Sequence, residues 1–356
     1  MGGKYVLVLV LMLLSGLNSQ VAVGAGPDRY WFLIHDRAVI AELKLSPEEQ
    51  AAVRQEIDPL DLKFMALRGT TPERVAKELP EIIVEAKKRL HGTLKPEQER
   101  RLAEINLRVE GPAGILSTDV ATQMKFTADQ KKKVEKITAD TQKLIEDLER
   151  QLKDGKPPEP LHTEAKKLRS KEQDDVYKVL SKTQQALWRK LAGETFDAAR
   201  IGKMAFKAPE IIDTNIWVNS QPLSLAQQKG KVVALHFYTY GCINCIHNYP
   251  WLRAWHDELT PKGLVMVGIH TPEGEGEKVL DSIKKKAKEE KLLFPIVVDN
   301  DRQNWSAWGN SMWPTVYLID KQGYMRTFWM GELKWQGTDG EKIIRDQIEE
   351  LLAEES

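Results

Sequence analysis

The sequence has few cysteines, no excess of charge of either sign and no long apolar run after its first residues. Its 356 residues include two cysteines, and 52 Lys and Arg balance 52 Asp and Glu. A chain without net charge offers no bulk electrostatic attraction to nucleic acid or to an anionic membrane surface. We therefore expect no nucleic-acid partner. Two cysteines cannot both form a structural disulfide and carry out redox chemistry, so any thiol chemistry must use this pair.

The composition is that of a globular protein rather than a disordered one. Hydrophobic residues make up 42% of the chain and charged residues 29%, which is within the ordinary range for folded domains. A chain of this length has room for two domains of average size.

The first 25 residues have the pattern of a signal peptide. Lys4 gives a short positive region, residues 5–14 are almost wholly apolar, and residues 23–25 have the small-x-small form of a cleavage site. The apolar run is too short to span a bilayer comfortably, so we expect cleavage rather than a retained anchor. The mature protein is then expected in an extracytoplasmic, oxidising space, a bacterial periplasm, where a dithiol stays reduced only if a partner supplies electrons.

The two cysteines lie three residues apart, in the sequence CINC at 242–245. They follow an apolar, β-branched run that predicts a buried strand, and they precede a predicted helix. A CxxC motif between a strand and a helix is typical of a dithiol redox centre. The helix N-terminus stabilises a thiolate on Cys242, and Cys245, one turn later, is placed to attack a mixed disulfide on Cys242.

Residues 28–196 predict helices, and the starts of four of these helices share one pattern. Three of them, at 45–49, 126–130 and 180–184, have Ser or Thr followed three residues later by Glu or Gln, which is a capping box. The fourth, at 94–98, keeps the Gln but has Lys95 at the cap position.

The four starts form two pairs at a nearly constant offset, which we interpret as an internal duplication. We expect a helical domain over 26–205, with its copies at about 45–110 and 126–196. The starts loosely resemble the LTxxQ pattern of Spy- and CpxP-like periplasmic proteins, which bind unfolded clients or sense envelope stress. We favour a plain helical bundle with ordinary caps as the explanation of this pattern.

From about residue 211 the pattern changes to strands that alternate with helices, which predicts a layered α/β domain. We place this domain at 206–356. The expected strands are 232–238, 264–270, 295–298, 315–319 and 324–330, and the expected helices are 242–259, 277–291 and 340–352.

This part of the chain resembles the thioredoxin superfamily, and within it the extracytoplasmic TlpA-like and DipZ-type domains. The resemblance rests on an ordered set of motifs: FYTYGCINC at 237–245, Pro250 in the following helix, GIHTPE at 268–273, VDND at 298–301 and WPT at 313–315. It implies an α/β thioredoxin-like fold, a central mixed sheet flanked by helices, preceded by the all-α domain.

The resemblance also implies roles for individual residues. Cys242 is the expected nucleophile, and Cys245 resolves the mixed disulfide and leaves a Cys242–Cys245 disulfide. Pro314 is expected after a cis peptide bond, which is rare and structurally deliberate, in a loop that faces the dithiol and holds the backbone of the substrate. The implied substrate-binding residues are Tyr240, Met312, Trp313 and Thr315.

Two residues are candidates for the proton acceptor of the reaction. Thioredoxins often have a buried acid six residues before the first cysteine, and here that position is His236. An imidazole can act as a base because its pKa lies near neutrality, but His236 can equally be a core residue whose N–H bonds a carbonyl. Glu273, after the neighbouring strand, is the second candidate.

The cysteines could in principle bind a metal or form a purely structural disulfide. A zinc site needs about four ligands, of which the thiols supply two, with His236 and His247 as conceivable additions. A purely structural disulfide stays open, although closing so short a loop contributes little stabilisation. We expect no metal and no dissociable cofactor.

These residues lead to two hypotheses about function. The first is an extracytoplasmic thiol-disulfide oxidoreductase that reduces or exchanges disulfides of client proteins and has a membrane redox partner of the DsbD type. The alternative is a periplasmic chaperone or stress sensor, in which the helical half binds clients and the dithiol is a redox latch.

Overall fold

The structure, a computed structural model, describes residues 29–153, 156–335 and 337–355. The signal peptide predicted over residues 1–25 lies outside this description. The described residues divide into two compact units. One combines residues 29–53 with Ile83–Lys203, and the other combines Arg54–Ile82 with the chain from Met204 onward.

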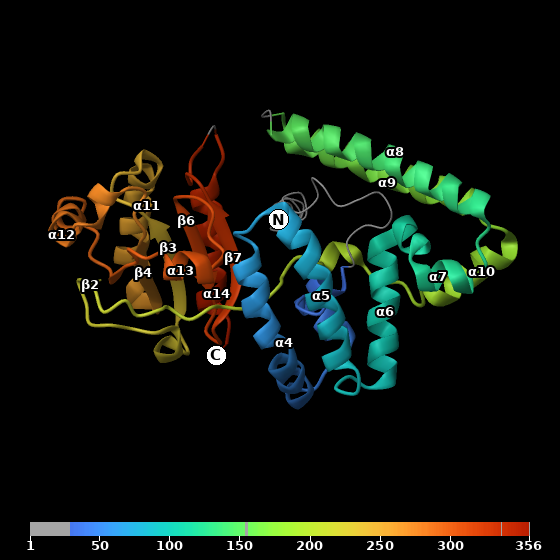
Figure 1. The fold of residues 1–356 in the computed structure, drawn as a ribbon, viewed down its shortest axis with the longest axis horizontal. Helices are drawn as coiled ribbons and strands as arrows, with labels where there is room; N and C mark the ends of the chain where they lie inside the picture. The colour runs from blue at the N-terminus through green and yellow to red at the C-terminus, as the bar shows by residue number, and fades with distance from the viewer. Residues whose placement is uncertain (1–28, 154–155, 336, 356) are drawn as a thin grey trace. The chain divides into compact units, whose positions relative to one another are not determined.

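The first unit is helical, as expected. Two long helices, α4 (Pro47–Leu67) and α5 (Pro72–Leu90), are divided between the units: α4 begins and α5 ends in the first unit, and their other ends belong to the second. The helical segments of this part of the chain, drawn in blue to yellow-green in Figure 1, are α2 Tyr30–Leu33, α3 Arg37–Glu42, α4 Pro47–Leu67, α5 Pro72–Leu90, α6 Pro96–Glu110, η1 Gly111–Leu116, α7 Thr118–Gln123, α8 Ala128–Lys153, α9 Pro158–Val179, α10 Lys182–Leu191 and η2 Ala198–Arg200.

The three predicted capping boxes are confirmed by reciprocal hydrogen bonds. In the third, the Ser181 N–H donates to Gln184 Oε1 over 2.9 Å, and the Gln184 N–H donates to Ser181 Oγ over 3.3 Å. Each box satisfies two backbone donors that the first turn of a helix leaves without partners. The other two boxes join Ser46 with Glu49 and Thr127 with Gln130.

The capping residues of each pair also contact each other. Gln98 Nε2 donates to Glu49 over 3.2 Å, and Gln130 Nε2 donates to Gln184 over 2.8 Å. In each half of the unit, the Glu or Gln three residues after the cap of one helix thus contacts the equivalent residue of the other helix. This equivalence of contacts supports the interpretation of an internal duplication.

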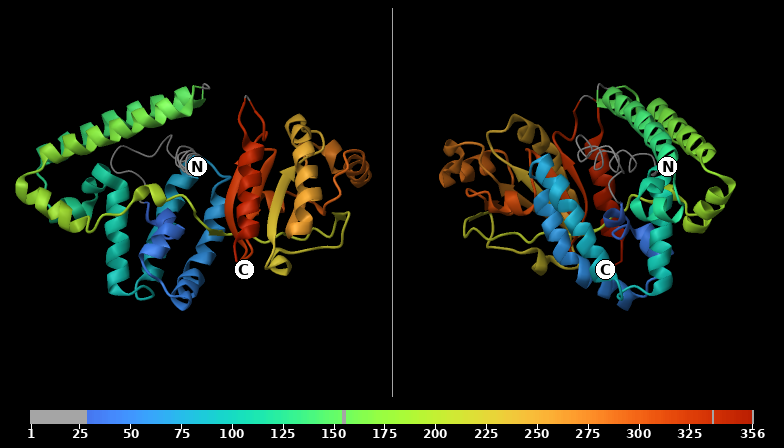
Figure 2. Two further views of the ribbon diagram at one scale, coloured as in Figure 1. Left: turned by 180° about the vertical axis from the view of Figure 1, so that it is seen from behind. Right: turned by 45° about the vertical axis from the view of Figure 1, so that its right-hand side comes forward.

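The second half of the helical unit is a long hairpin on a small core. Helices α8 and α9 lie side by side along their length, as Figures 1 and 2 show in green. Apolar side chains of η1, α7, the start of α8 and the end of α9, with the residues that follow α7 and α9, pack together at one end of the hairpin: Ile115, Leu116, Val120, Met124, Val134, Val176 and Leu180.

The second unit contains a seven-stranded mixed sheet of order β1-β7-β6-β3-β4-β5-β2. Strand β3 runs parallel to β4 and antiparallel to β6. The strands are β1 Phe206–Lys207, β2 Trp217–Val218, β3 Val232–Tyr238, β4 Leu264–His270, β5 Ile296–Val298, β6 Thr315–Ile319 and β7 Tyr324–Met330. The five predicted strands are confirmed, with β5 one residue shorter. Strands β1 and β2 were not predicted, because two residues are too few to form a pattern.

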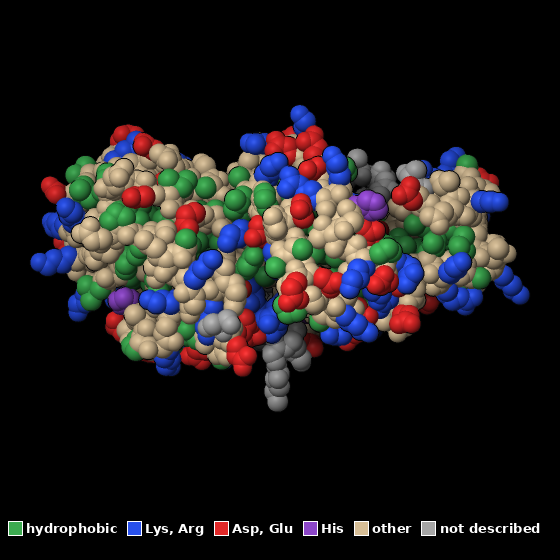
Figure 3. Space-filling view, turned by 90° about the horizontal axis from the view of Figure 1, so that it is seen from below, with side chains coloured by type: hydrophobic (Ala, Val, Ile, Leu, Met, Phe, Trp, Pro, Cys, Tyr) green, Lys and Arg blue, Asp and Glu red, His purple; other side chains and the backbone are tan. Residues whose placement is uncertain are grey.

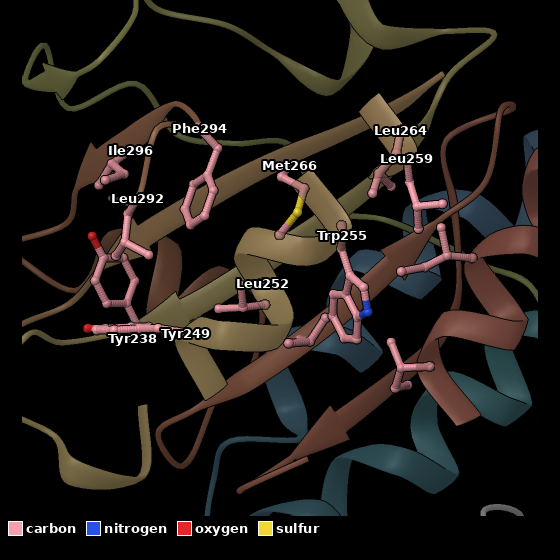
Figure 4. Packing of buried hydrophobic residues seen from close by; sticks show 14 of the residues in the cluster. Tyr238, Tyr249, Leu252, Trp255, Leu259, Leu264, Met266, Leu292, Phe294 and Ile296 are labelled. Carbon is pink, nitrogen blue, oxygen red and sulfur yellow. The ribbon is translucent and has the colours of Figure 1, made fainter. Parts of the chain in front are cut away.

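One face of the sheet packs on α11 (Ile243–Leu259), α12 (Leu280–Glu289) and α14 (Gly340–Ala353). Figure 4 shows Trp255 and Leu252 of α11 with Met266 of β4 and Phe294 in this core. Cys245 belongs to the same buried cluster, so the core that stabilises the domain also encloses one of the two thiols.

The opposite face contacts the segment Arg54–Ile82. The Phe64 ring lies 5.3 Å from that of Phe206 in β1, and the Arg68 guanidinium lies 4.1 Å from the Phe328 ring of β7. The carboxylate of Asp61 accepts a hydrogen bond of 2.6 Å from the Lys207 N–H. The end of α4 is therefore part of the sheet domain, although it precedes most of the helical unit in sequence.

The surface carries charges of both signs. Figure 3 shows Lys and Arg side chains interspersed with Asp and Glu on the face it presents, in agreement with the balanced composition. Among the residues that the structure describes, no helix combines the length and the apolar character needed to cross a bilayer.

We predict that Gly309→Ala destabilises the second unit. Gly309 has a φ of +55°, and a Cβ at this position would overlap the carbonyl oxygen of Met65 at the end of α4. Conformational strain and overpacking together should lower the free energy of unfolding by about 2–5 kcal/mol, measured by urea denaturation. Gly230→Ala is the matched control, because Gly230 has a φ of +84° but no atom near the added Cβ. Equal losses in both variants would contradict the packing of α4 on this loop.

Candidate active site

Cys242 occupies the cap position of α11, where strand β3 has ended and the helix begins. Its φ and ψ are −78° and 114°, so its backbone is extended, while its carbonyl already accepts from the N–H groups of Cys245 and Ile246 over 3.1 Å. The predicted helix after the motif is confirmed, with Pro250 inside it. The first cysteine therefore faces the unpaired N–H groups of a helix N-terminus.

The surroundings of Cys242 favour its thiolate. A hydrogen bond from the Cys245 thiol is the largest influence, and the N–H groups of Cys245 and Asn244 add to it. Partial burial and the charge of Glu273 oppose them, and the balance lowers the pKa of Cys242 to about 7. Cys242 is partly exposed, so a nucleophilic sulfur is accessible near neutral pH.

The surroundings of Cys245 have the opposite effect. Its side chain is fully buried, and burial raises the pKa of the thiol, as do its hydrogen bond to Cys242 and the charge of Glu277. Cys245 is therefore a neutral donor to Cys242. Both cysteines are free thiols here, so the Cys242–Cys245 disulfide stays a prediction.

The loop before β6 lies at the same edge of the sheet as the CxxC motif. Phe237, near the end of β3, pairs with Thr315, at the start of antiparallel β6, so the residues after β3 and those before β6 are neighbours. The Trp313–Pro314 peptide bond is cis, as predicted. The Thr315 hydroxyl donates to the Met312 carbonyl over 2.9 Å and closes the loop.

The predicted substrate-binding residues differ in exposure. Met312 is exposed, Trp313 and Tyr240 are half-buried, and Thr315 is fully buried. Thr315 therefore offers a substrate no side chain, since its hydroxyl is already bonded to Met312. The Tyr240 hydroxyl donates to the Gly276 carbonyl over 2.9 Å, which ties this residue to the loop after β4.

His236 lies in the core under the motif. It is fully buried and stacks on Tyr238 with a centroid distance of 5.2 Å. Among the described residues, neither of its ring nitrogens has a hydrogen-bond partner, so the expected bond to a carbonyl is absent. Burial lowers the pKa of His236 to about 3, which keeps the imidazole neutral. Its role as a base stays a prediction.

Glu273, the other predicted proton acceptor, is exposed at the start of the loop after β4. Its charge acts on Cys242, whose pKa it raises. Its own backbone N–H donates to Glu277 Oε2 over 2.7 Å. Its catalytic role also stays a prediction.

A polar cluster that was not predicted from the sequence lies beside the motif. The Thr239 hydroxyl donates to Glu277 Oε2 over 2.6 Å and lies 3.4 Å from Nε2 of buried His270. Glu277 was expected to begin a helix over 277–291, but the structure has a separate turn, η5 Glu275–Lys278, before α12 begins at Leu280. The helix cannot start earlier because Val279 is extended, with φ and ψ of −76° and 112°.

A metal centre would need further ligands around the two thiols. His247 Nδ1 instead pairs with Glu332 over 3.0 Å, and His236 is enclosed in the core. Across the described ranges, no three or more His, Cys, Asp and Glu side chains are grouped so that they could hold a metal ion.

Comparison with known proteins finds matches to the sheet domain. Residues 203–328 match the model of the AhpC/TSA family. The chain is 27% identical over 152 residues to the thiol-disulfide oxidoreductase YkuV of Bacillus subtilis, covering 43% of this chain and 98% of YkuV. It is 34% identical over 144 residues to the protein DipZ of Mycobacterium bovis, covering 40% of this chain.

The likenesses differ in how much of each protein they cover. The chain spans only 20% of the length of DipZ. A crystal structure described as a thioredoxin-like superfamily protein is 26% identical, with a TM-score of 0.38, and covers 42% of this chain and 98% of that one. The matches to the AhpC/TSA model and to YkuV thus concern the C-terminal part, which is homologous to thiol-disulfide oxidoreductases.

We predict that alkylation of Cys242 by iodoacetamide has its pH midpoint near 7, below the value of about 8.5 for an unperturbed thiol. Cys245→Ala should move the midpoint upward, because it removes the thiol that donates to the thiolate. Mass spectrometry of the adduct across pH 5–10 measures both. A wild-type midpoint at or above that of a free thiol would contradict the assigned electrostatics.

Proposed function

Because residues 203–328 match the model of the AhpC/TSA family, we propose that this chain is an extracytoplasmic thiol-disulfide oxidoreductase that acts on protein disulfides. One observation carries the proposal: the two thiols differ in character. Cys242 is accessible with a pKa of about 7, whereas Cys245 is buried and protonated. A nucleophile and a protected second thiol are what the two steps of disulfide exchange require.

In the first step, the Cys242 thiolate attacks one sulfur of a client disulfide. That S–S bond breaks, the other client sulfur leaves as a thiolate, and a mixed disulfide forms on Cys242. In the second step, Cys245 loses its proton and attacks Cys242, and the second client sulfur leaves. The client gains two electrons and two protons, and the enzyme retains a Cys242–Cys245 disulfide.

Exposed apolar side chains next to the dithiol support binding of a polypeptide client. Ile243 within the motif is 60% exposed, Met312 43% and Met330 48%. Met330 pairs with Thr315 across strands β6 and β7, so it lies beside the cis-proline loop. Flexible methionine side chains adapt to clients of different shape.

The proposed compartment follows from the signal-peptide pattern of residues 1–25. In an oxidising space, repeated reduction of clients needs an electron donor. We propose a membrane redox partner of the DsbD type, which would reduce the Cys242–Cys245 disulfide after each cycle.

The helical unit favours a second candidate function. Its two halves repeat the same contact between capping residues, as in a duplicated binding module. In that case the helices bind unfolded clients as a chaperone or stress sensor, and the dithiol is a redox-sensitive latch that has no catalytic activity. Suppression of client aggregation with no catalysed insulin reduction would favour this function.

We predict that Cys245→Ser traps a client on Cys242. The variant keeps the nucleophile but lacks the resolving thiol, so a stoichiometric mixed disulfide should accumulate and insulin reduction should stop. Non-reducing gel electrophoresis with and without dithiothreitol detects the adduct.

Cys242→Ser is the matched control for this trap, and it should form no adduct because Cys245 is buried. If Cys242→Ser forms the adduct instead, the roles of the two cysteines are reversed. If neither variant forms one, the proposed activity is wrong.

A further inference from the structure

The carboxylate of Glu277 is fixed against the dithiol loop. One oxygen, Oε2, accepts from the Thr239 hydroxyl over 2.6 Å and from the Glu273 N–H over 2.7 Å. Thr239 comes three residues before Cys242, and its own N–H points at the sulfur of Cys245. A single residue therefore contacts the carboxylate with its side chain and the buried thiol with its backbone.

The other oxygen of Glu277 lies over the backbone of Gly241. A Cβ at position 241 would overlap Glu277 Oε1, so the absence of a side chain directly before Cys242 allows the carboxylate to approach. Glu277 is only half-buried, which leaves it a route for exchanging protons with water. Neither of its contacts is a salt bridge, and the cation next to it in sequence, Lys278, pairs with Glu275.

The two proton acceptors expected from the sequence are less suited to Cys245. His236 would have to become charged in an apolar core, where its pKa is about 3. Glu273 is exposed, and its charge acts on Cys242. Cys245 is fully buried, so hydroxide from solvent does not reach it freely.

We propose that Glu277 accepts the proton that Cys245 loses in the resolving step. The inference rests on the proposed oxidoreductase function and adds a residue to it. The proton moves from the Cys245 sulfur to the Glu277 carboxylate. The sulfur electron pair then forms the bond to Cys242, the bond from Cys242 to the client breaks, and the client sulfur leaves as a thiolate that takes a proton from water.

The timing of this transfer follows from what holds the proton on Cys245. A hydrogen bond to Cys242 and the charge of its thiolate both raise the pKa of Cys245. Both vanish when Cys242 enters a mixed disulfide, because its sulfur is then neutral. Cys245 thus becomes easier to ionise at the moment when its attack is needed.

Among the described residues, no cation forms an ion pair with the Glu277 carboxylate. The titratable groups around Cys245 and Glu277 are Cys242, Tyr238, Tyr240, Tyr249, His236, His270, Glu273 and Lys278. Burial lowers the pKa of His270 to about 4, and burial raises the pKa of Tyr238 and Tyr249. Near neutral pH the imidazoles of His236 and His270 and the phenols of Tyr238 and Tyr249 are therefore uncharged, so none of these four rings offsets the charge of a carboxylate beside them.

Reaction of the fully reduced, full-length protein with 5,5′-dithiobis(2-nitrobenzoate) separates the two steps. Attack by Cys242 releases one equivalent of the coloured thiolate, and attack by Cys245 on the mixed disulfide releases a second. Stopped-flow absorbance with the reagent in excess, between pH 6 and 8.5, gives both rates.

In Glu277→Gln, the amide oxygen still accepts from Thr239 and Glu273, but it cannot take a proton. We expect the first phase to stay close to the wild-type rate and the second to slow by about 100-fold or more at pH 7. The second phase should also become proportional to hydroxide concentration. If Glu277 acted only through its charge, Glu277→Gln would instead speed the second phase. Removal of the negative charge would lower the pKa of Cys245 and favour its thiolate.

Asp281→Asn is the matched control, because it changes an exposed acid in the first turn of α12 and should leave both phases unchanged. Glu277→Asp should recover part of the lost rate. Thr239→Val, which removes the tether, should also slow only the second phase and provides the test if Glu277→Gln does not fold.

A second phase in Glu277→Gln with the wild-type rate and pH profile would overturn the inference. Equal slowing of both phases would also overturn it, because it would show that Glu277 only stabilises the loop that holds both cysteines. Failure of the wild-type protein to give a first phase would instead overturn the proposed function.

Discussion

The hydrogen bond from the Cys245 thiol to the Cys242 sulfur is the interaction on which the proposed chemistry depends. It stabilises charge on the accessible sulfur and raises the pKa of its donor, so one contact makes the two thiols unequal. The helix N-terminus adds backbone N–H groups to the same sulfur. Two cysteines of identical type thus become a nucleophile and a protected thiol because one of them is enclosed in the core and the other is not.

The sheet supplies that enclosure. Strands β3 and β6 are antiparallel neighbours, which brings the CxxC motif and the cis-proline loop to one edge although about 70 residues separate them in the chain. Helix α11 lies on the core of this sheet, with Cys245 among the buried side chains of the cluster. The opposite face contacts Phe64 and Arg68 of α4. The segment Arg54–Ile82 thus belongs structurally to the domain that carries the dithiol.

Much of the fold was predictable because its signals are local. A capping box such as Ser181 with Gln184 lies within one helical turn, and the β-branched run of β3 lies within one strand. The interactions that favour these elements are therefore between residues close in sequence. The position of α4 was not predictable, since Phe64 and Phe206 share no pattern that marks them as partners. Glu277 was misassigned for a similar reason: it resembles the first turn of a helix, and only the folded chain brings it to Thr239.

Local sequence is enough to place a single dithiol at a strand-to-helix junction, because spacing, strand pattern and helix start are properties of adjacent residues. The acids and histidines that surround this dithiol, and the charge state of the histidines, depend on the folded chain. His236 is neutral because the core excludes water from it, and Glu277 faces the motif because the loop after β4 folds back over Gly241. Protonation depends on solvation and on charges from distant parts of the chain, and neither is encoded in local sequence.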